Sequence, residues 1–188
     1  MAVERKPGCG ADRQCGRADA KRSTDDVALI AVSKTRDANE IRPLLDAGHR
    51  MFGENRVQEA ASKWPDLRIA YPDIQLHLIG QLQSNKAEEA VELFDCIHSL
   101  DRLSLLSALL KAMTKAEKHI PCFIQINIGE EEQKGGCAIT ELPELLEAAK
   151  AAHIEVVGLM CIPPADVEAA PYFALLAELA ARHGLPQL

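Results

Sequence analysis

The stretch Val27-Ala28-Leu29-Ile30-Ala31-Val32-Ser33-Lys34-Thr35 decides the predicted fold, because a lysine stands where an otherwise apolar run ends. A run rich in Val, Ile and Leu predicts a buried parallel strand over residues 27–32. In barrel folds the carboxyl ends of strands line the active site, so Lys34 is expected to enter a partly dry pocket. Desolvation there disfavours the ammonium form and leaves an amine that can attack an aldehyde and form a Schiff base. The alternative is a lysine that ends a strand and extends into water.

The composition is that of one ordinary globular domain, with 188 residues of which 47% are hydrophobic and 26% are charged. A formal net charge of -7 argues against nucleic acid or an anionic membrane as the main partner. No apolar run approaches membrane-spanning length, and residues 1–26 lack the apolar core of a signal peptide. We therefore expect a cytoplasmic protein that binds neither nucleic acid nor membrane.

The cysteines are scattered, with no C-x-x-C pair and no histidines at zinc-ligand spacing. They are Cys9, Cys15, Cys96, Cys122, Cys137 and Cys161. We expect reduced thiols, of which those at positions 96, 122 and 161 act as small core residues. No metal ligands are expected.

Apolar strand patterns alternate with helical patterns from residue 27 onward, whereas residues 1–26 show neither pattern and predict a loop or disorder. Strands are expected over residues 27–32, 50–52, 74–79, 95–99, 122–128 and 154–160. Helices are expected to begin near residues 37, 55, 84, 103, 140 and 172, and the second of them is expected to end before Trp64-Pro65. About six β-then-α units predict a parallel sheet with crossover helices, either a (β/α) barrel or a doubly wound sheet.

Short polar residues precede several of these helices in capping patterns. Asp37 with Glu40 forms a capping box, and Asn55 heads the next helix in the same way. Ser84 and Thr140 are the expected caps of two later helices.

Four polar residues fall at or just past the carboxyl ends of expected strands, where either fold places its ligand. They are Lys34, Asn55, His77 and Asn127. The alternation of residues 74–79 puts His77 on the face opposite the leucines of that strand.

Together these residues resemble the family of pyridoxal phosphate homeostasis proteins, also called proline synthetase co-transcribed proteins, which look like the barrel domain of alanine racemase. The motifs that carry the resemblance are AVSKT at 31–35, FGENRVQE at 52–59, HLIGQLQSNK at 77–86, HSLDR at 98–102, QINI at 125–128 and GLMCIP at 158–163. They cover residues 27–188 in the order in which the family has them.

The resemblance implies a (β/α)8 barrel of the alanine racemase N-terminal type, in which Lys34 carries pyridoxal 5'-phosphate as an internal aldimine. It implies intracellular cofactor homeostasis without robust turnover, with pyridoxal phosphate and pyridoxal-phosphate-dependent apo-enzymes as partners, and a monomer. The alternatives are a racemase-like enzyme and an inactive remnant without a ligand. A racemase-like enzyme needs a second acid or base across the cofactor ring. The only tyrosines, Tyr71 and Tyr172, lie outside the matching motifs, so this alternative lacks support.

Six residues are the expected cofactor contacts: Lys34, Asn55, His77, Ser84, Asn127 and Met160. Each of the last five has a structural alternative. Asn55 and Ser84 fit plain helix starts, His77 fits a buried hydrogen-bonded histidine, and Met160 fits core filler instead of a wall against the pyridine ring.

The sequence departs from the family at both ends. Family members open with an amphipathic helix, a pattern that residues 1–26 lack. Family members continue with Ser-Met-Gly-Met-Ser and Arg-x-Gly-Thr segments, which supply the last two strands and most of the phosphate-binding amides. This sequence stops at Leu185-Pro186-Gln187-Leu188, where that part is expected to begin. We therefore expect a C-terminally truncated barrel over residues 27–188, with about six βα units and weak phosphate anchoring.

Overall fold

The computed structural model describes residues 26–131 and 133–188, so the loop or disorder expected over residues 1–26 lies outside the described residues except for residue 26. The chain divides into two units, residues 1–30 and Ala31–Leu188. Residues 27–30 form no strand, and Val27 and Leu29 are about half exposed. The strand predicted over 27–32 is therefore confirmed only at its end, because only Ala31 and Val32 have ladder partners.

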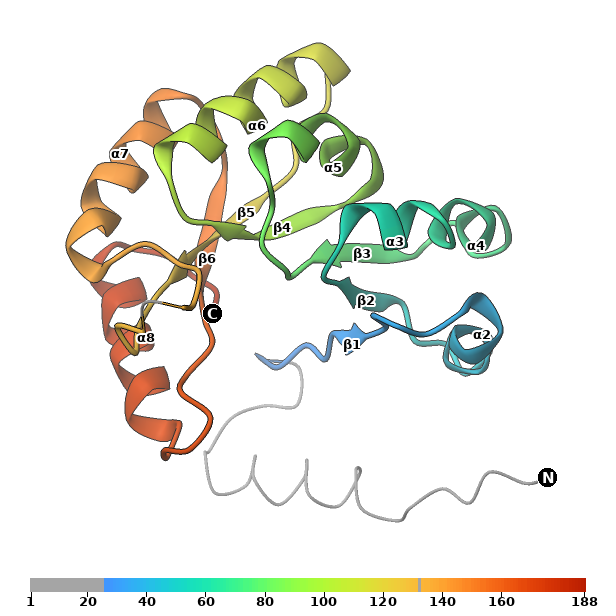
Figure 1. Ribbon diagram of the computed structural model, residues 1–188, viewed down its shortest axis with the longest axis horizontal. Coiled ribbons are helices and arrows are strands. Elements are labelled where there is room, and N and C mark those ends of the chain that lie inside the picture. The colour runs from blue at the N-terminus through green and yellow to red at the C-terminus, as the bar shows by residue number, and fades with distance from the viewer. Residues whose placement is uncertain (1–25, 132) are drawn as a thin grey trace. The chain divides into compact units, whose positions relative to one another are not determined.

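The second unit is built on one six-stranded parallel sheet (Figure 1). Its strands are β1 (Ala31–Val32), β2 (Met51–Glu54), β3 (Gln75–Leu78), β4 (Cys96–Leu100), β5 (Cys122–Ile126) and β6 (Val156–Cys161). They lie in the order β1-β2-β3-β4-β5-β6. A doubly wound sheet reverses its strand order at a switch point, so the continuous order excludes that alternative and confirms an arc of a (β/α) barrel.

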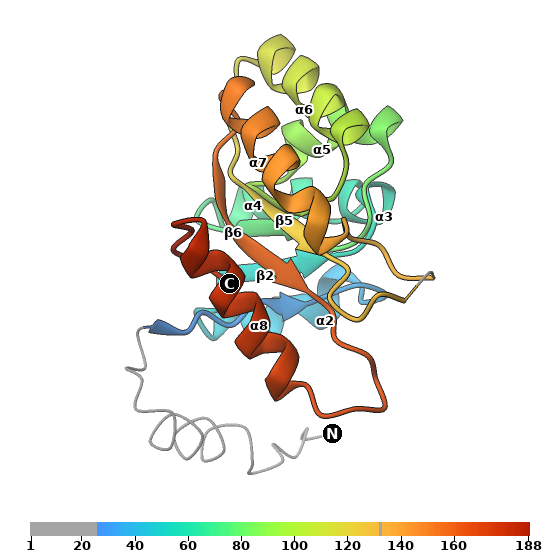
Figure 2. The ribbon, with the colours of Figure 1, turned by 90° about the vertical axis from the view of Figure 1, so that its left-hand side faces the viewer.

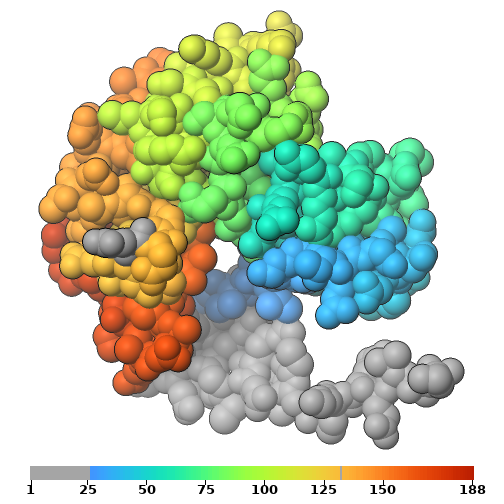
Figure 3. Space-filling view, viewed as in Figure 1, coloured from blue at the N-terminus to red at the C-terminus, as the bar shows by residue number. Residues whose placement is uncertain are grey.

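The helices lie around the outside of the curved sheet (Figures 1 and 2). They are α2 (Ala38–Asp46), α3 (Val57–Ala61), α4 (Trp64–Ala70), α5 (Ala87–Leu93), α6 (Leu103–Ala116), α7 (Leu142–Ala151) and α8 (Ala170–Arg182), with short 3-10 helices η2 (Ser84–Lys86) and η3 (Ile139–Glu141). Figure 3 shows α3, α5 and α6 as one continuous outer surface. Within residues 26–131 and 133–188, none of these helices is long and apolar enough to cross a membrane.

The core fills the space between the sheet and its helices. Leu76 and Leu78 of β3 are fully buried there, while His77 between them reaches the opposite, inner face of the sheet and contacts His98, as the alternation predicts. Phe52 of β2 packs against Trp64 of α4 with ring centroids 5.0 Å apart. This packing fixes the strands whose carboxyl ends carry the candidate residues.

Of the four predicted helix caps, one is confirmed and three are wrong, although helices begin close to all four positions. Asp37 and Glu40 form the expected capping box, since Asp37 Oδ1 accepts from the Glu40 amide at 3.0 Å and Glu40 Oε2 accepts from the Asp37 amide at 3.1 Å. Asn55, Ser84 and Thr140 do not cap helices.

Each wrong cap has a local cause. Asn55 stays at the end of β2, packed against Gly80, and Arg56 precedes α3 instead. Ser84 lies inside η2, where its hydroxyl is 3.4 Å from Arg102. Thr140 lies inside η3, whose turn is closed by the Ala138 amide donating to Glu141.

The helix expected to end before Trp64-Pro65 does end there, but a second helix, α4, begins at that point and was not predicted. Pro65 stands in the first turn of α4, where a missing amide hydrogen disrupts no helical hydrogen bond. Proline therefore starts a helix here rather than a loop.

Candidate functional site

Strand register decides which side chains share the inner face of the sheet. Residues paired across parallel strands point to the same face, and side chains alternate along each strand. Four strands, β1 to β4, are joined through the pairs Val32–Gly53, Gly53–His77 and His77–Cys96. At the far end of the strand order, Gln125 of β5 pairs with Met160 of β6. The inner face therefore brings together residues that are far apart in the sequence.

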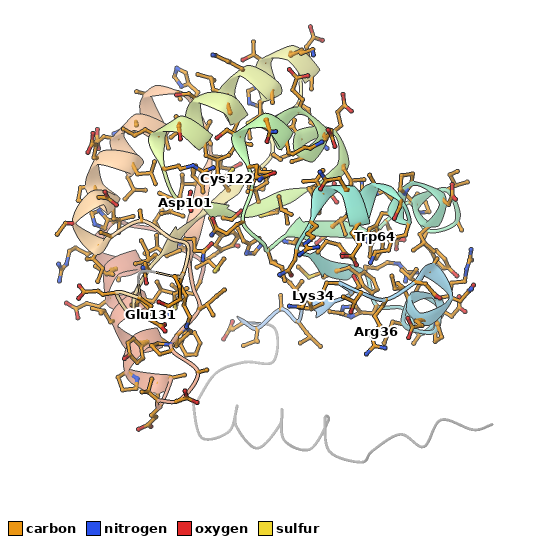
Figure 4. All side chains as sticks on the ribbon, in the orientation of Figure 1. Lys34, Arg36, Trp64, Asp101, Cys122 and Glu131 are labelled. Atoms are coloured by element: carbon orange, nitrogen blue, oxygen red, sulfur yellow. The ribbon has the colours of Figure 1, made fainter. Side chains whose placement is uncertain are left out.

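Lys34 lies just past β1, two residues beyond Val32 (Figure 4). Its side chain is exposed, so the expectation of a partly dry pocket is wrong for this structure. The cause is the position of β1, which is two residues long and forms the edge of the sheet. Val32 is accordingly 51% exposed. The amine of Lys34 is accessible to a ligand but is not desolvated by the described residues.

Asn55 lies at the carboxyl end of β2, half-buried against Gly80. A Cβ at position 80 would lie 2.2 Å from the Asn55 carbonyl oxygen, so only glycine fits there. The Oδ1 atom of Asn55 is buried and, among the residues that the structure describes, has no hydrogen-bond partner. Because buried acceptors are nearly always satisfied, this oxygen is a candidate contact for a ligand donor.

His77 and His98 form a pair on the inner face. His77 Nδ1 lies 2.9 Å from His98 Nε2, and the ring of His98 stacks on Phe123 with centroids 4.3 Å apart. Burial lowers the pKa of His77, and burial together with the neighbouring His77 lowers the pKa of His98 to about 4. Both imidazoles are therefore neutral at pH 7. His77 Nε2 is buried and has no hydrogen-bond partner within the described part of the chain.

One group of donors in the described residues resembles a metal site. His77, Cys96 and His98 are all buried, and each offers a donor atom within 4.8 Å of the others. Two imidazoles and a thiolate suit zinc or a softer cation. However, burial raises the pKa of Cys96 to about 12, and the imidazoles already bond each other. We assign no metal to this group.

Asn127 follows β5 and uses both ends of its side chain within its own loop. Its Nδ2 donates to the Glu131 carbonyl at 2.9 Å, and its Oδ1 accepts from the Glu131 amide at 3.1 Å. The side chain therefore shapes the loop after β5 and has no free end in this structure.

Two glutamines join the loops after β3 and β5. Gln81 Nε2 donates to the buried Gln125 Oε1 at 2.8 Å, and Gln125 Nε2 donates to the Gly135 carbonyl at 3.1 Å. The contact between Gln81 and Gln125 was not predicted, because the two residues are 44 positions apart in the sequence. The only signal in the sequence is the alternation along residues 122–128, which puts Gln125 and Asn127 on one face.

The six expected contacts fall into three groups. Asn55, His77 and Met160 lie on or at the end of strands on the inner face, with Met160 half-buried beside Gln125. Lys34 and Asn127 follow β1 and β5. Ser84 lies on η2, where its hydroxyl is beside Arg102. The arrangement matches a small aldehyde that carries polar groups. The exposed Lys34 side chain offers an amine to the aldehyde, and Asn55 Oδ1 and His77 Nε2, which lack partners among the described residues, offer contacts for its polar groups.

Known proteins similar to this chain share both its sequence and its fold. The family model described as alanine racemase, N-terminal domain, matches residues 17–182. The pyridoxal phosphate homeostasis protein of Escherichia coli is 37% identical over 169 residues, which are 89% of this chain and 70% of that protein.

Two solved structures of PipY from Synechococcus elongatus are also similar. The structure without PLP has a TM-score of 0.79 at 37% identity, covering 95% of this chain and 84% of that one. The structure with PLP bound has a TM-score of 0.72 at 35% identity, covering 94% and 85%.

Proposed function

Because the chain belongs to the family of pyridoxal phosphate homeostasis proteins, we propose that it binds pyridoxal 5'-phosphate at Lys34 and holds it in a releasable form. The bound group supplies an aldehyde, which condenses with a lysine amine and releases water in a reversible reaction. The observation that carries the proposal is the position of Lys34 within AVSKT, exposed at the carboxyl end of β1 and next in the sheet to the strand of Asn55.

The noncovalent contacts are assigned to residues with free polar atoms or open faces. Asn55 Oδ1 accepts a hydrogen bond from the ligand, and His77 offers its buried Nε2. Met160 supplies an apolar wall on the inner face. Asn127 and Ser84 act indirectly, since Asn127 holds the loop after β5 and Ser84 contacts Arg102. A PipY relative solved with PLP bound supports this choice of ligand.

Storage rather than turnover is the proposed role. The relatives are named for homeostasis of the cofactor, not for a reaction. A free aldehyde attacks amines indiscriminately, whereas a reversible bond to one lysine limits its concentration. The recipients in this proposal are pyridoxal-phosphate-dependent apo-enzymes, and the carrier is a monomer.

The proposed compartment is the cytoplasm. Four cysteines among the described residues are free thiols, Cys96, Cys122, Cys137 and Cys161. Unpaired thiols are typical of a reducing compartment. The domain limits 27–188 remain a prediction.

The proposal is tested by titrating the purified chain with pyridoxal phosphate and following the absorbance of the lysine adduct. The expected result is a saturable signal with a stoichiometry near one, lost in Lys34→Ala. Lys111→Ala is the matched control, because Lys111 is an exposed lysine on α6. An unsaturable signal of equal size in the parent and in Lys34→Ala would overturn the proposal.

A further inference from the structure

Lys63 is a buried lysine whose ammonium group contacts both ends of the loop that carries Lys34. The residue lies between α3 and α4 in the chain, and its side chain is 8% exposed. Lys63 Nζ donates to the carbonyl oxygens of Ser33 at 2.8 Å and Arg36 at 3.0 Å. Lys34 and Thr35 lie between these two carbonyls, so one cation closes the loop from its outer side.

Two carboxylates fix this ammonium group in place. Lys63 Nζ lies 2.9 Å from Glu54 Oε1 and 3.1 Å from Glu59 Oε1. Glu54 is fully buried, and its Oε1 also accepts from Ser33 Oγ at 2.6 Å and from Trp64 Nε1 at 3.0 Å. A buried charge is tolerated only when it is paired and hydrogen-bonded, so Lys63 and Glu54 depend on each other. Figure 4 shows the positions of Lys34, Arg36 and Trp64.

The backbone between the two carbonyls is strained. Thr35 has a φ of 63°, a left-handed conformation that is unfavourable for a β-branched residue. Such a conformation persists only where the surroundings impose it. Here the Thr35 amide donates to the carboxylate of Glu59, which also pairs with Lys63. The strained turn is therefore held by the same cluster, and it sets the direction in which the chain leaves Lys34.

We propose that Lys63 is a positioning residue for cofactor binding: its ammonium, held by Glu54 and Glu59, fixes residues 33–36 so that the Lys34 amine meets the inner face. This inference rests on the proposed function. Lys63 acts entirely through the backbone of the loop and does not touch the ligand. Its contribution is to reduce the freedom of the loop before the ligand arrives.

The direct test removes the cluster without leaving an unpaired buried charge. Lys63→Met alone would strand the carboxylate of Glu54, so the variant is Lys63→Met combined with Glu54→Gln. The amide oxygen at position 54 can still accept from Ser33 and Trp64. We expect a cooperatively folded protein whose affinity for pyridoxal phosphate, measured by adduct absorbance, is at least tenfold weaker than that of the parent.

A second variant keeps the test decisive if the double variant does not fold. Glu59→Gln changes only a half-buried side chain that lines an outer cavity of about 540 Å³, where solvent can accommodate the change. It weakens the acceptor of the Thr35 amide and the pairing with Lys63. We expect a three- to tenfold loss of affinity with little change in thermal stability.

Lys118→Met is the matched control for a merely structural role. Lys118 Nζ donates to three backbone carbonyls, those of Val91, Glu92 and Phe94, and it lies outside the Lys34 loop. We expect this variant to lower the melting temperature while the affinity and the labelling of Lys34 stay as in the parent.

The outcomes separate this inference from the proposed function. Failure of the parent chain to form a saturable adduct at Lys34 would overturn the proposed function and this inference with it. A parent that binds, with unchanged affinity in the folded double variant or in Glu59→Gln, would overturn the positioning role alone. Equal losses of affinity in Lys118→Met and Glu59→Gln would also overturn it, since the effect would then follow general stability.

Discussion

The Nδ1 atom of His77 lies 2.9 Å from the Nε2 atom of His98, and this contact joins β3 to β4 on the inner face of the sheet. One hydrogen lies between these two nitrogens, so one ring donates and the other accepts. Both rings are buried, and the ring of His98 is also stacked on Phe123. Protonating either ring would place a charge in this buried contact.

Acid is therefore expected to destabilise the fold through these histidines. The pKa of His98 is lowered from 6.5 to about 4 by burial and by His77, so the unfolded chain binds more protons than the folded chain between these values. The histidine contribution to stability is complete above pH 6.5 and is lost as the pH falls towards 4. Urea unfolding of the parent and of His98→Gln across this range checks the prediction. Parallel stability curves for the two proteins would contradict it.

Thr35→Asn is expected to stabilise the chain. Asparagine tolerates the left-handed region better than threonine, and relieving the conformation at φ 63° should add about 1 kcal/mol to the free energy of unfolding. Thr114→Asn in α6 is the control, because position 114 has an ordinary helical backbone and the same change should not stabilise it. Equal changes in the unfolding free energies of both variants would argue against strain at Thr35.

Asn55→Ala is expected to separate binding from folding. Its Oδ1 has no partner among the described residues, so removing the amide leaves no broken hydrogen bond at that atom. The affinity for pyridoxal phosphate should fall about five- to tenfold, since one net hydrogen bond is worth about 1 kcal/mol. Calorimetric melting and an absorbance titration of the same sample measure the two effects. A large drop in melting temperature with unchanged affinity would contradict this role.

Gly80→Ala is expected to disturb the end of β2. The added methyl group would lie 2.2 Å from the Asn55 carbonyl oxygen, and forcing these backbones apart should lower stability by about 1–3 kcal/mol. Gly48→Ala is a useful comparison, because nothing lies within 4 Å of a Cβ there and only its φ of 89° opposes the change. Chemical denaturation of both variants gives the two values. A harmless Gly80→Ala would show that residues 55 and 80 are not in close contact.

Periodicity predicted most of the fold because it depends on local patterns. The run 122–128 and the alternating segment 74–79 each became a strand of the parallel sheet, β5 and β3. The strand over residues 27–32 was predicted too long, because an apolar run does not show whether a neighbouring strand is present to pair with it. The caps at Asn55 and Ser84 failed because tertiary contacts with Gly80 and Arg102 decided their conformations.

The candidate site was only partly predictable. Lys34, Asn55 and His77 were predicted as site residues from their places at or near strand ends, and they remain candidates. The contact of His77 with His98 depends on strand register, which the sequence does not reveal. The link from Lys63 to Ser33 spans 30 positions, and the four-residue spacing of Glu59 and Lys63 was its only local signal.

Lys34 is the proposed attachment point for pyridoxal phosphate. The most direct measurement is to mix the chain with one equivalent of the cofactor, reduce the adduct with borohydride and map the modified peptides by mass spectrometry. We predict that the label lies predominantly on the peptide containing Lys34. A label distributed over the exposed lysines, with Lys34 modified no more than Lys111, would contradict the account.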